Sequence, residues 1–385
     1  MFGLFSRDTK KLTLLLEVQS GLVRAALVGH TPQNPPKILY VTTHKIPTTF
    51  DSGSTRMVKM VLKAVHDVSE AILREALPHA EAKGYSKKSL KKVEYIFSSP
   101  WLISESKMVK ISYPIETQIS KEVVVKIVED ECNLLAKKYE LADAENIEQK
   151  IFEVKLNGYP VTRFDGRKAK ELEVSFATSV SSKKFLHRLR SEVNKVLHIA
   201  QGEYHSALLL QYNALRSLTK HKNEYIYAHI HDELTDIIMV KNGLCTQTSS
   251  LPFGAQTLMR KVALSLKEPL ATTESTLSLL ASNTLDPIIA QNINKSLSQV
   301  IQEWKLDFFT ALTSTLPLTL VPRTIYLSAH THFEIFRDII VMENQFNFEI
   351  VSYDDMPEKP RLEFDRESEH SRMIEMYAFS FETMV

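Results

Sequence analysis

A polar cluster between two predicted strands is the part of this sequence best suited to chemistry. Apolar residues alternate along both halves of Tyr225–Gly243 (YIYAHIHDELTDIIMVKNG), the pattern of half-buried strands joined by a turn. His229 and His231 lie two residues apart on the first strand, so they share a face, and Asp232 follows them. With Asp232 or Glu17 these imidazoles could bind a divalent metal, and the competing interpretation is a polar plug without a ligand.

The composition is that of an ordinary globular chain, large enough for two or more domains. Its 385 residues are 44% hydrophobic and 24% charged, and 47 basic against 46 acidic residues give a net charge of +1, so no global attraction to nucleic acid or lipid is predicted. Cys132 and Cys245 are far apart, which predicts neither a zinc site nor a disulfide framework. No apolar run approaches the roughly 20 residues that a membrane span needs. Glycine is scarce, at 10 residues, although phosphate-binding loops use it to bring backbone amides to the anion.

The N-terminal part of the chain predicts half of an RNase H-like α/β unit. Apolar runs separated by turn residues indicate three antiparallel strands at Leu12–Val18, Leu22–Val28 and Ile38–Lys45. Apolar residues at three- and four-residue spacing predict a helix over Thr55–Leu77, and Val93–Ser98 reads as a fourth strand.

A module of different character interrupts this unit before it is complete. Its predicted elements are a strand at Ser106–Tyr113, a helix from Ser120 to about Tyr139, strands at Ile147–Leu156 and Leu172–Ser179, and a helix near Lys183–His198. A strand-helix-strand-strand-helix unit of roughly 90 residues is large enough to form a small domain of its own.

The C-terminal half repeats the element order of the first half, which indicates an internal duplication of topology. After the predicted hairpin at Tyr225–Gly243 come a helix, a long helix that begins at Asp286-Pro287, and a buried strand at Thr324–Ser328. We therefore predict the following division: 1–98 first lobe, first part; 99–186 inserted domain; 187–222 first lobe, return segment; 223–265 second lobe, first part; 266–316 small helical subdomain; 317–385 second lobe, last part.

With these elements placed, the chain resembles the actin-like ATPase superfamily, in the branch of the division protein FtsA and the type IV pilus assembly protein PilM. Leu14–Leu27 (LLLEVQSGLVRAAL) is similar to the first phosphate segment of that family. Tyr225–Gly243 with Ser250–Gly254 (SLPFG) is similar to the second, and Ile325–His330 (IYLSAH) to the adenosine segment. The resemblance implies an α/β, actin-like fold of two RNase H-like lobes, with an inserted SHS2-like α+β domain in the first.

The departures from the family's motifs imply a degenerate nucleotide cleft. Glu17 stands where the family has an aspartate that holds Mg²⁺-bound water. The residues that match the motifs are Ser20, Arg24, Thr235, Asp236 and Gly254. The residues that replace motif residues, mostly glycines, are His229, His231, Asp232, Ala329 and His330. Since the added side chains block bare backbone, and Asp232 would repel a triphosphate, we expect ATP hydrolysis to be lost, no cofactor, and at most weak binding of ATP and Mg²⁺.

The resemblance implies a non-catalytic cytoplasmic scaffold, peripheral to the inner membrane, in a type IV pilus or related secretion assembly. Its implied partner is the cytoplasmic tail of a single-span inner-membrane protein, similar to PilN. We expect the tail to bind beside Ser106–Tyr113 and the helix from Ser120, at Ile111, Tyr113 and Val124. Self-association is compatible with this interpretation, whereas nucleic acid is not an expected partner.

Two other functions remain open at this stage. The first is an FtsA-like tether for a division ring, which would need a membrane anchor. Met373–Phe381 reads as a last core helix rather than as such an anchor, and this favours the pilus branch. Met1–Phe5 could insert shallowly into a membrane, with a frayed terminus as the alternative. The second is an actin homologue that still binds and hydrolyses ATP.

Overall fold

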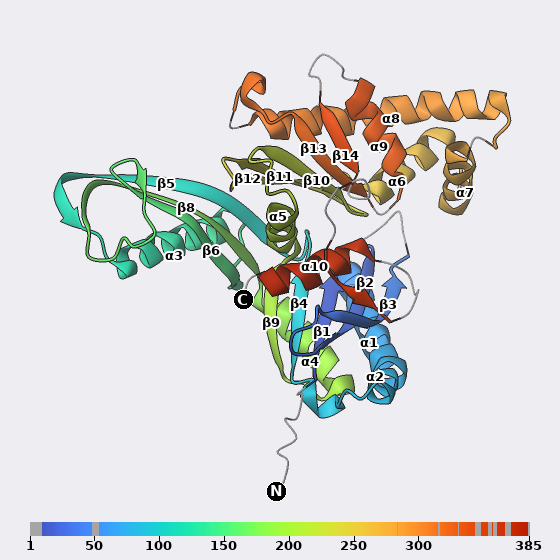
Figure 1. Cartoon of the computed structure of the whole chain (residues 1–385). Coiled ribbons are helices and arrows are strands. Elements are labelled where there is room, and N and C mark those ends of the chain that lie inside the picture. The colour runs from blue at the N-terminus through green and yellow to red at the C-terminus, as the bar shows by residue number, and fades with distance from the viewer. Residues whose placement is uncertain are drawn as a thin grey trace, which may run out of the picture.

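Two sheets with the same strand order form the frame of this protein in its computed structural model (Figure 1). The structure describes residues 10–47, 54–282, 284–314, 316–329, 331–342, 348–352, 356, 360–365 and 371–383. The first sheet has the order β15-β3-β2-β1-β4-β9 and the second the order β12-β11-β10-β13-β14. The shared pattern, three antiparallel strands followed by two parallel ones, confirms the duplication of topology.

The first lobe is built around the predicted N-terminal hairpin. Its strands are β1 (Lys11–Val18), β2 (Leu22–His30), β3 (Lys37–Lys45), β4 (Lys92–Phe97), β9 (Gln201–Ser206) and β15 (Glu363–Phe364). Its helical segments are α1 (Ser54–Ala71), η1 (Ile72–Ala76), α2 (Leu77–Ala82), η2 (Lys87–Ser89) and α4 (Lys183–Leu197). The apolar spacing of α1 buries Val61, Val65 and Val68 against the sheet, as predicted.

Two assignments of the sequence reasoning are wrong in this lobe. The predicted division gives the first turn of α4 to the inserted domain and the rest, from residue 187, to the first lobe, but the whole buried face of α4, with Leu186 and Leu189, joins the first-lobe core. The strand β15 lies in the segment assigned to the second lobe, yet it pairs with β3. Asp365, next to β15, holds it there through His79 Nε2 at 2.6 Å and Lys83 Nζ at 3.0 Å.

The second lobe places a long helix and three shorter ones on its sheet. Its strands are β10 (Tyr225–Ile230), β11 (Thr235–Lys241), β12 (Leu244–Leu251), β13 (Thr324–Ala329) and β14 (Glu349–Ser352). Its helical segments are α6 (Ala255–Leu266), α7 (Leu270–Ala281), α8 (Pro287–Thr313), η3 (Leu318–Leu320) and α9 (Phe333–Met342). Asn242 and Gly243 both have positive φ, 52° and 72°, as the predicted tight turn requires. Trp304 and Phe308 of α8 pack in the core of this sheet, so the predicted helical subdomain 266–316 shares the core of the lobe.

Two helices fill the space between the sheets. They are α5 (Ala207–Leu218) and α10 (Arg372–Thr383), which lie between the lobes (Figure 1). Apolar side chains of both sheets, such as Leu15 and Tyr227, pack with Tyr212 and Ile374 of these helices in a single core cluster. The two lobes are therefore joined through a continuous hydrophobic layer rather than by a flexible linker.

The inserted domain projects from the first lobe as a four-stranded sheet with one helix on it (Figure 1). Its elements are β5 (Ile103–Gln118), α3 (Lys121–Lys138), β6 (Ala144–Leu156), β7 (Tyr159–Pro160) and β8 (Lys168–Ser182), with the strand order β5-β8-β6-β7. Ser120 caps α3 as predicted, accepting a hydrogen bond from Val123 N. The insertion is thus confirmed, whereas its classification as SHS2-like stays a prediction.

The base of the insert contacts both lobes. The Ser106 hydroxyl of β5 donates to Cys245 O of β12 at 2.7 Å. On the other side, Lys150 Nζ of β6 donates to Asn213 Oδ1 of α5 at 2.6 Å. Burial lowers the pKa of Lys150, as expected for an ammonium group held away from water. Within the described ranges, no helix combines the length and apolar character that a bilayer crossing requires.

The second-lobe core gives a direct test of this arrangement. Trp304 is fully buried, stacks on Phe308 and donates to Thr235 Oγ1 at 3.0 Å. We expect Trp304→Ala to lower the free energy of unfolding of this lobe by about 3–5 kcal/mol, because it leaves a cavity. Leu306 lies two residues away but is 69% exposed, so Leu306→Ala should change the free energy of unfolding by less than about 0.5 kcal/mol. Urea denaturation followed by circular dichroism measures both, and equal effects would contradict the placement of α8.

Candidate functional site

The ends of three strands bring the predicted nucleotide segments together at the centre of the molecule. His229 of β10 lies opposite Asp236 of β11 and beside Ser328 of β13. Glu17, near the end of β1, faces them from the first lobe, and Tyr377 of α10 contacts Glu17 there. The carboxyl ends of parallel strands are where ligands bind in open α/β sheets, so this is the position at which a nucleotide would be expected.

The carboxylate of Glu17 is fully buried and is satisfied by this chain's own donors. Arg24 Nη1 donates to Glu17 Oε2 at 2.7 Å, and Gln19 Nε2 donates to Oε1 at 2.5 Å. The Tyr377 hydroxyl donates to Oε1 at 2.8 Å. Burial, reinforced by this neighbouring carboxylate, raises the pKa of Tyr377 well above its ordinary value and keeps it a donor. Glu17 is therefore engaged by three side chains.

A chain of side-chain contacts crosses from one lobe to the other beside Glu17. His231 Nδ1 lies 3.4 Å from Gln19 Oε1, and His231 Nε2 lies 3.0 Å from Asp236 Oδ2. The Ser250 hydroxyl donates to Asp236 Oδ1 at 2.5 Å and lies 3.0 Å from the hydroxyl of Ser99 in the first lobe. Burial alone would raise the pKa of Asp236, but His231 and the two hydroxyl donors outweigh it and lower the pKa. We call the contacts among Gln19, His231, Asp236, Ser250 and Ser99 the interlobe seam. Polar side chains therefore fill the space between the lobes here.

The two imidazoles do not converge on a common point. His229 Nδ1 lies 2.6 Å from Ser328 Oγ, and the rings of His229 and His231 meet edge to face at 4.1 Å between centroids. Both nitrogens of His231 already face Gln19 and Asp236. The arrangement favours the polar plug over the metal site.

Elsewhere in the described ranges, one group of potential metal ligands does come close together. It consists of Glu94, Glu203 and His205 on β4 and β9. Lys92 Nζ already lies 2.7 Å from Glu94 and 3.1 Å from Glu203, so the two acids have a cation of their own.

Asp232 occupies the space between the two phosphate segments. A β-carbon on Gly21, in the turn between β1 and β2, would lie 2.1 Å from Asp232 Oδ2, so the carboxylate rests directly on the bare backbone of the opposite lobe. The side chain is buried, and burial raises its pKa, with His231 opposing the shift. A phosphate between these segments would meet a carboxylate instead of backbone amides.

The backbone amides at the start of α6 are likewise occupied by groups of this chain. Ala255 N donates to His231 O at 2.9 Å, and Gln256 N donates to Asp232 O at 2.6 Å. A β-carbon on Gly254 would lie 2.5 Å from His231 O, which explains why this motif glycine is kept. Amides at a helix N-terminus are the usual ligands of a phosphate, and here the loop carbonyls occupy them. The residues present do not fit a nucleoside triphosphate with Mg²⁺ in this geometry.

The other predicted site residues serve the fold around this seam. The Thr235 hydroxyl donates to Phe253 O at 2.7 Å and accepts from Trp304. Ser20 is buried, and its hydroxyl has no hydrogen-bond partner in the described part of the chain. Ala329 ends β13, and His330 lies outside the described residues.

Sequence reasoning missed several members of the seam. Gln19, Ser99 and Tyr377 each supply a polar contact across it, and Gly21 supplies the surface on which Asp232 rests. No local signal in the sequence marks Tyr377, since it lies 360 positions beyond Glu17 and reads as an ordinary helix residue.

The predicted partner-binding residues differ in their accessibility. Val124 is 0% exposed in the core of the insert, so its prediction as a contact residue is wrong. Tyr113 is half-buried against the same core, and Ile111 is half-buried on the same strand, β5. A cavity of about 670 Å³ opens beside the base of β5, between it and β12 of the second lobe. Its lining combines hydroxyl and amide side chains with apolar and charged ones: Ser99, Ser104, Ser106, Thr246, Gln247, Thr248, Ser249, Ser250 and Ser314, with Pro100, Leu102, Ile103, Tyr139, Leu234, Glu105 and Lys138.

The comparisons with known proteins identify the fold. No family model matches the chain, and no curated protein matches it in sequence. Among solved structures, the PilM-PilN type IV pilus biogenesis complex matches with a TM-score of 0.62 at 13% identity, covering 97% of this chain and 98% of that one. The ethanolamine utilization protein EutJ of Carboxydothermus hydrogenoformans matches with a TM-score of 0.46 at 11% identity, covering 96% and 89% of the two chains. A glycerol dehydratase reactivase matches with a TM-score of 0.45 at 9% identity, covering 88% and 95%.

The match to the pilus complex identifies the architecture of the chain. The fold shared with the pilus complex over 97% of this chain, together with the two duplicated sheets, confirms the predicted α/β, actin-like fold class. At 13% identity, the match to the pilus protein shows the fold alone.

Two carboxylates of the seam should respond to amide substitution with opposite sign. Burial raises the pKa of Asp232 in the folded state. Its charged form therefore destabilises the folded state at pH values above the unfolded pKa of roughly 4, and this destabilisation vanishes at lower pH. Asp232→Asn should therefore raise the melting temperature at pH 7 and leave it nearly unchanged at low pH. Asp236 has a lowered pKa, so its carboxylate stabilises the fold at neutral pH and that stability is lost as pH falls. Asp236→Asn should lower the melting temperature at pH 7, and shifts of the same sign in a thermal scan would contradict the described seam.

Proposed function

We propose that the chain is a non-catalytic, actin-like scaffold in a type IV pilus or related secretion assembly, at the cytoplasmic face of the inner membrane. The observation that carries the proposal is the closed seam, in which Asp232 rests on Gly21 where phosphates would lie. The fold it shares with the PilM protein of the PilM-PilN complex supports the choice of assembly. By this likeness, its partner is the cytoplasmic tail of a single-span membrane protein.

The edge of β5 is the surface that best suits such a tail. β5 pairs with β8 on one side, and the base of its other edge contacts β12 through Ser104 and Ser106. Beyond Ser106 this edge offers backbone donors and acceptors to an extended segment. Met108 and Ile115 expose 57% and 71% of their surface along this strand, which gives a partner apolar contacts. Lys110 and Pro114 lie within this strand. Lysine and proline are common on edge strands, where they hinder pairing with a second copy of the chain.

Tail binding tests the assignment of this edge. The probe is a synthetic peptide with the cytoplasmic segment of a PilN-like, single-span membrane protein, and the measurement is fluorescence anisotropy. Ile111→Ala and Tyr113→Ala should each weaken binding about tenfold, because truncating an interface anchor removes more than 1 kcal/mol. Tyr159→Ala is the matched control, since Tyr159 is 74% exposed on β7 at the opposite edge of the same sheet. If the first two variants bind the peptide as well as the control does, the edge assignment is wrong.

The closed seam makes a separate prediction about nucleotide. Titration with labelled ATP and Mg²⁺ should show no saturation at low micromolar concentration, because Asp232 and the loop carbonyls occupy the positions of phosphate ligands. The protein's melting temperature should likewise be unchanged by ATP, since a ligand that binds only the folded state raises it. Saturable binding, or phosphate release that Glu17→Ala abolishes, would favour an active ATPase and overturn the proposal.

A further inference from the structure

Two neighbouring helices of the first lobe carry a surface of exposed positive charge. Arg56, Lys59 and Lys63 follow one another on α1 at three- and four-residue spacing, so they form one stripe. Lys184 and Arg188 form a second stripe on α4 at four-residue spacing. We call these five residues, all exposed, the basic surface.

Nearby acids compensate only a small part of the positive charge of this surface, that of Lys184 beside Asp143. None of the five side chains forms an ion pair within the described part of the chain. The acidic residues farther along the same helices have other partners: Asp67 with His44 at 3.3 Å, Glu70 with Arg74 at 3.2 Å, and Glu192 with Lys195 at 2.8 Å. In a chain whose net charge is only +1, this is a local concentration of charge rather than a general excess.

The two stripes lie side by side at the same level. α1 leads toward β4 and α4 leads into β9, and these strands are parallel, so the helices run in the same direction. His66 Nδ1 of α1 lies 3.3 Å from Glu192 of α4, which fixes their alignment. About one turn earlier on each helix Lys63 comes level with Arg188, and about two turns earlier Lys59 comes level with Lys184. Packed helices are about 8–10 Å apart, so the stripes merge into one surface.

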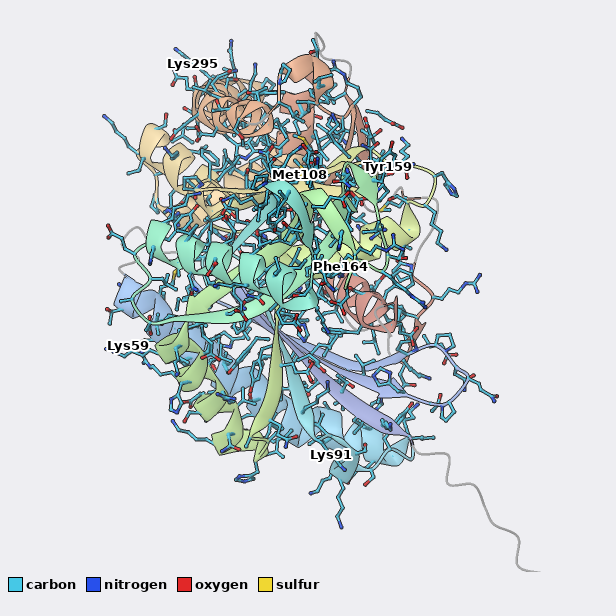
Figure 2. The ribbon with its side chains drawn as sticks, turned by 90° about the vertical axis from the view of Figure 1, so that its left-hand side faces the viewer. Lys59, Lys91, Met108, Tyr159, Phe164 and Lys295 are labelled. Atoms are coloured by element: carbon cyan, nitrogen blue, oxygen red, sulfur yellow. The ribbon has the colours of Figure 1, made fainter. Side chains whose placement is uncertain are left out.

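The basic surface adjoins the inserted domain. Asp143, which follows α3, accepts hydrogen bonds from Ser182 Oγ at 2.8 Å and Lys184 N at 3.0 Å, so the insert ends at the beginning of α4. Figure 2 looks at the molecule from the insert side, with Lys59 on the lower lobe below the insert helix and Lys295 at the opposite end. The Asp143 carboxylate offsets part of the charge of Lys184, while the other four cations keep theirs.

We infer that the basic surface binds the anionic headgroups of the membrane from which the tail emerges. This inference rests on the proposed function, because a tail bound at the insert holds the adjoining face of the protein close to the bilayer. Anionic leaflets attract clustered lysines and arginines within about a Debye length, roughly 8 Å at physiological salt. Two side-by-side helices present these charges broadly, as contact with a headgroup layer requires. Nucleic acid is disfavoured because single-strand sites add aromatic platforms for base stacking, and α1 and α4 expose no aromatic side chain there.

Vesicle co-sedimentation of the full chain tests the inference. The probes are vesicles rich in phosphatidylglycerol and vesicles of phosphatidylcholine alone. The unaltered protein should bind only the first, and added salt should weaken the binding. A variant with Lys59→Glu, Lys63→Glu and Arg188→Glu should lose binding by about tenfold or more. The matched control changes the same number of charges elsewhere, with Lys220→Glu, Lys267→Glu and Lys295→Glu, and should bind as the unaltered protein does.

The results separate this inference from the proposed function. Absence of binding to anionic vesicles, equal loss in both variants, or preferential binding of duplex DNA would each overturn the membrane assignment. Peptide anisotropy without lipid measures the tail independently, and the basic-surface variant should bind the peptide normally. Failure of the unaltered protein to bind the peptide would count against the proposed function while leaving the vesicle result as measured. Equal melting temperatures of the two variants exclude unfolding as the cause.

Discussion

A carboxylate buried at the centre of the molecule constrains the structure around it. Glu17 has no access to water, and a buried charge persists only when neighbouring groups supply opposite charge and hydrogen bonds. Arg24 supplies the charge, and Gln19 and Tyr377 complete the donors. Because Tyr377 belongs to the last helix and Glu17 to the first strand, satisfying this one side chain requires that both ends of the chain have folded onto the same site.

The consequence for ligand binding follows from the same geometry. Actin-like folds place a nucleotide between two lobes, and a phosphate there must be met by backbone amides or by cations. In this chain, Asp232 rests on Gly21, and the amides at the start of α6 bond to loop carbonyls. His231, held by Asp236 of its own lobe, then links the lobes through its contact with Gln19. The lobes therefore meet through side-chain contacts of the chain itself, which suits the scaffold role that we propose.

The inserted domain and the first lobe carry the two surfaces proposed to bind partners. β5 offers an open strand edge, and the basic surface on α1 and α4 lies directly beside the base of the insert. A tail that reaches the strand edge from a membrane would bring the positive helices to the headgroups. Two modest contacts, one with a peptide and one with a charged layer, reinforce each other because the first makes the second intramolecular.

The sequence by itself determined the features that depend on local chemistry. Apolar spacing predicted α1 and the strands of both hairpins, Asn242-Gly243 predicted its turn, and Ser120 predicted the start of α3. The same reasoning, with motif comparison, predicted the actin-like fold and located the segments that meet at the seam.

Only the tertiary structure decided which of these parts touch. It placed the first turn of α4 with the rest of that helix on the first lobe, placed Val124 in the insert core, and brought Tyr377 to Glu17. Periodicity shows which face of a helix is apolar, but not which of several cores that face will join. Partners of a buried charge are likewise invisible in sequence when hundreds of residues separate them, because only folding fixes the distances on which hydrogen bonds and ion pairs depend.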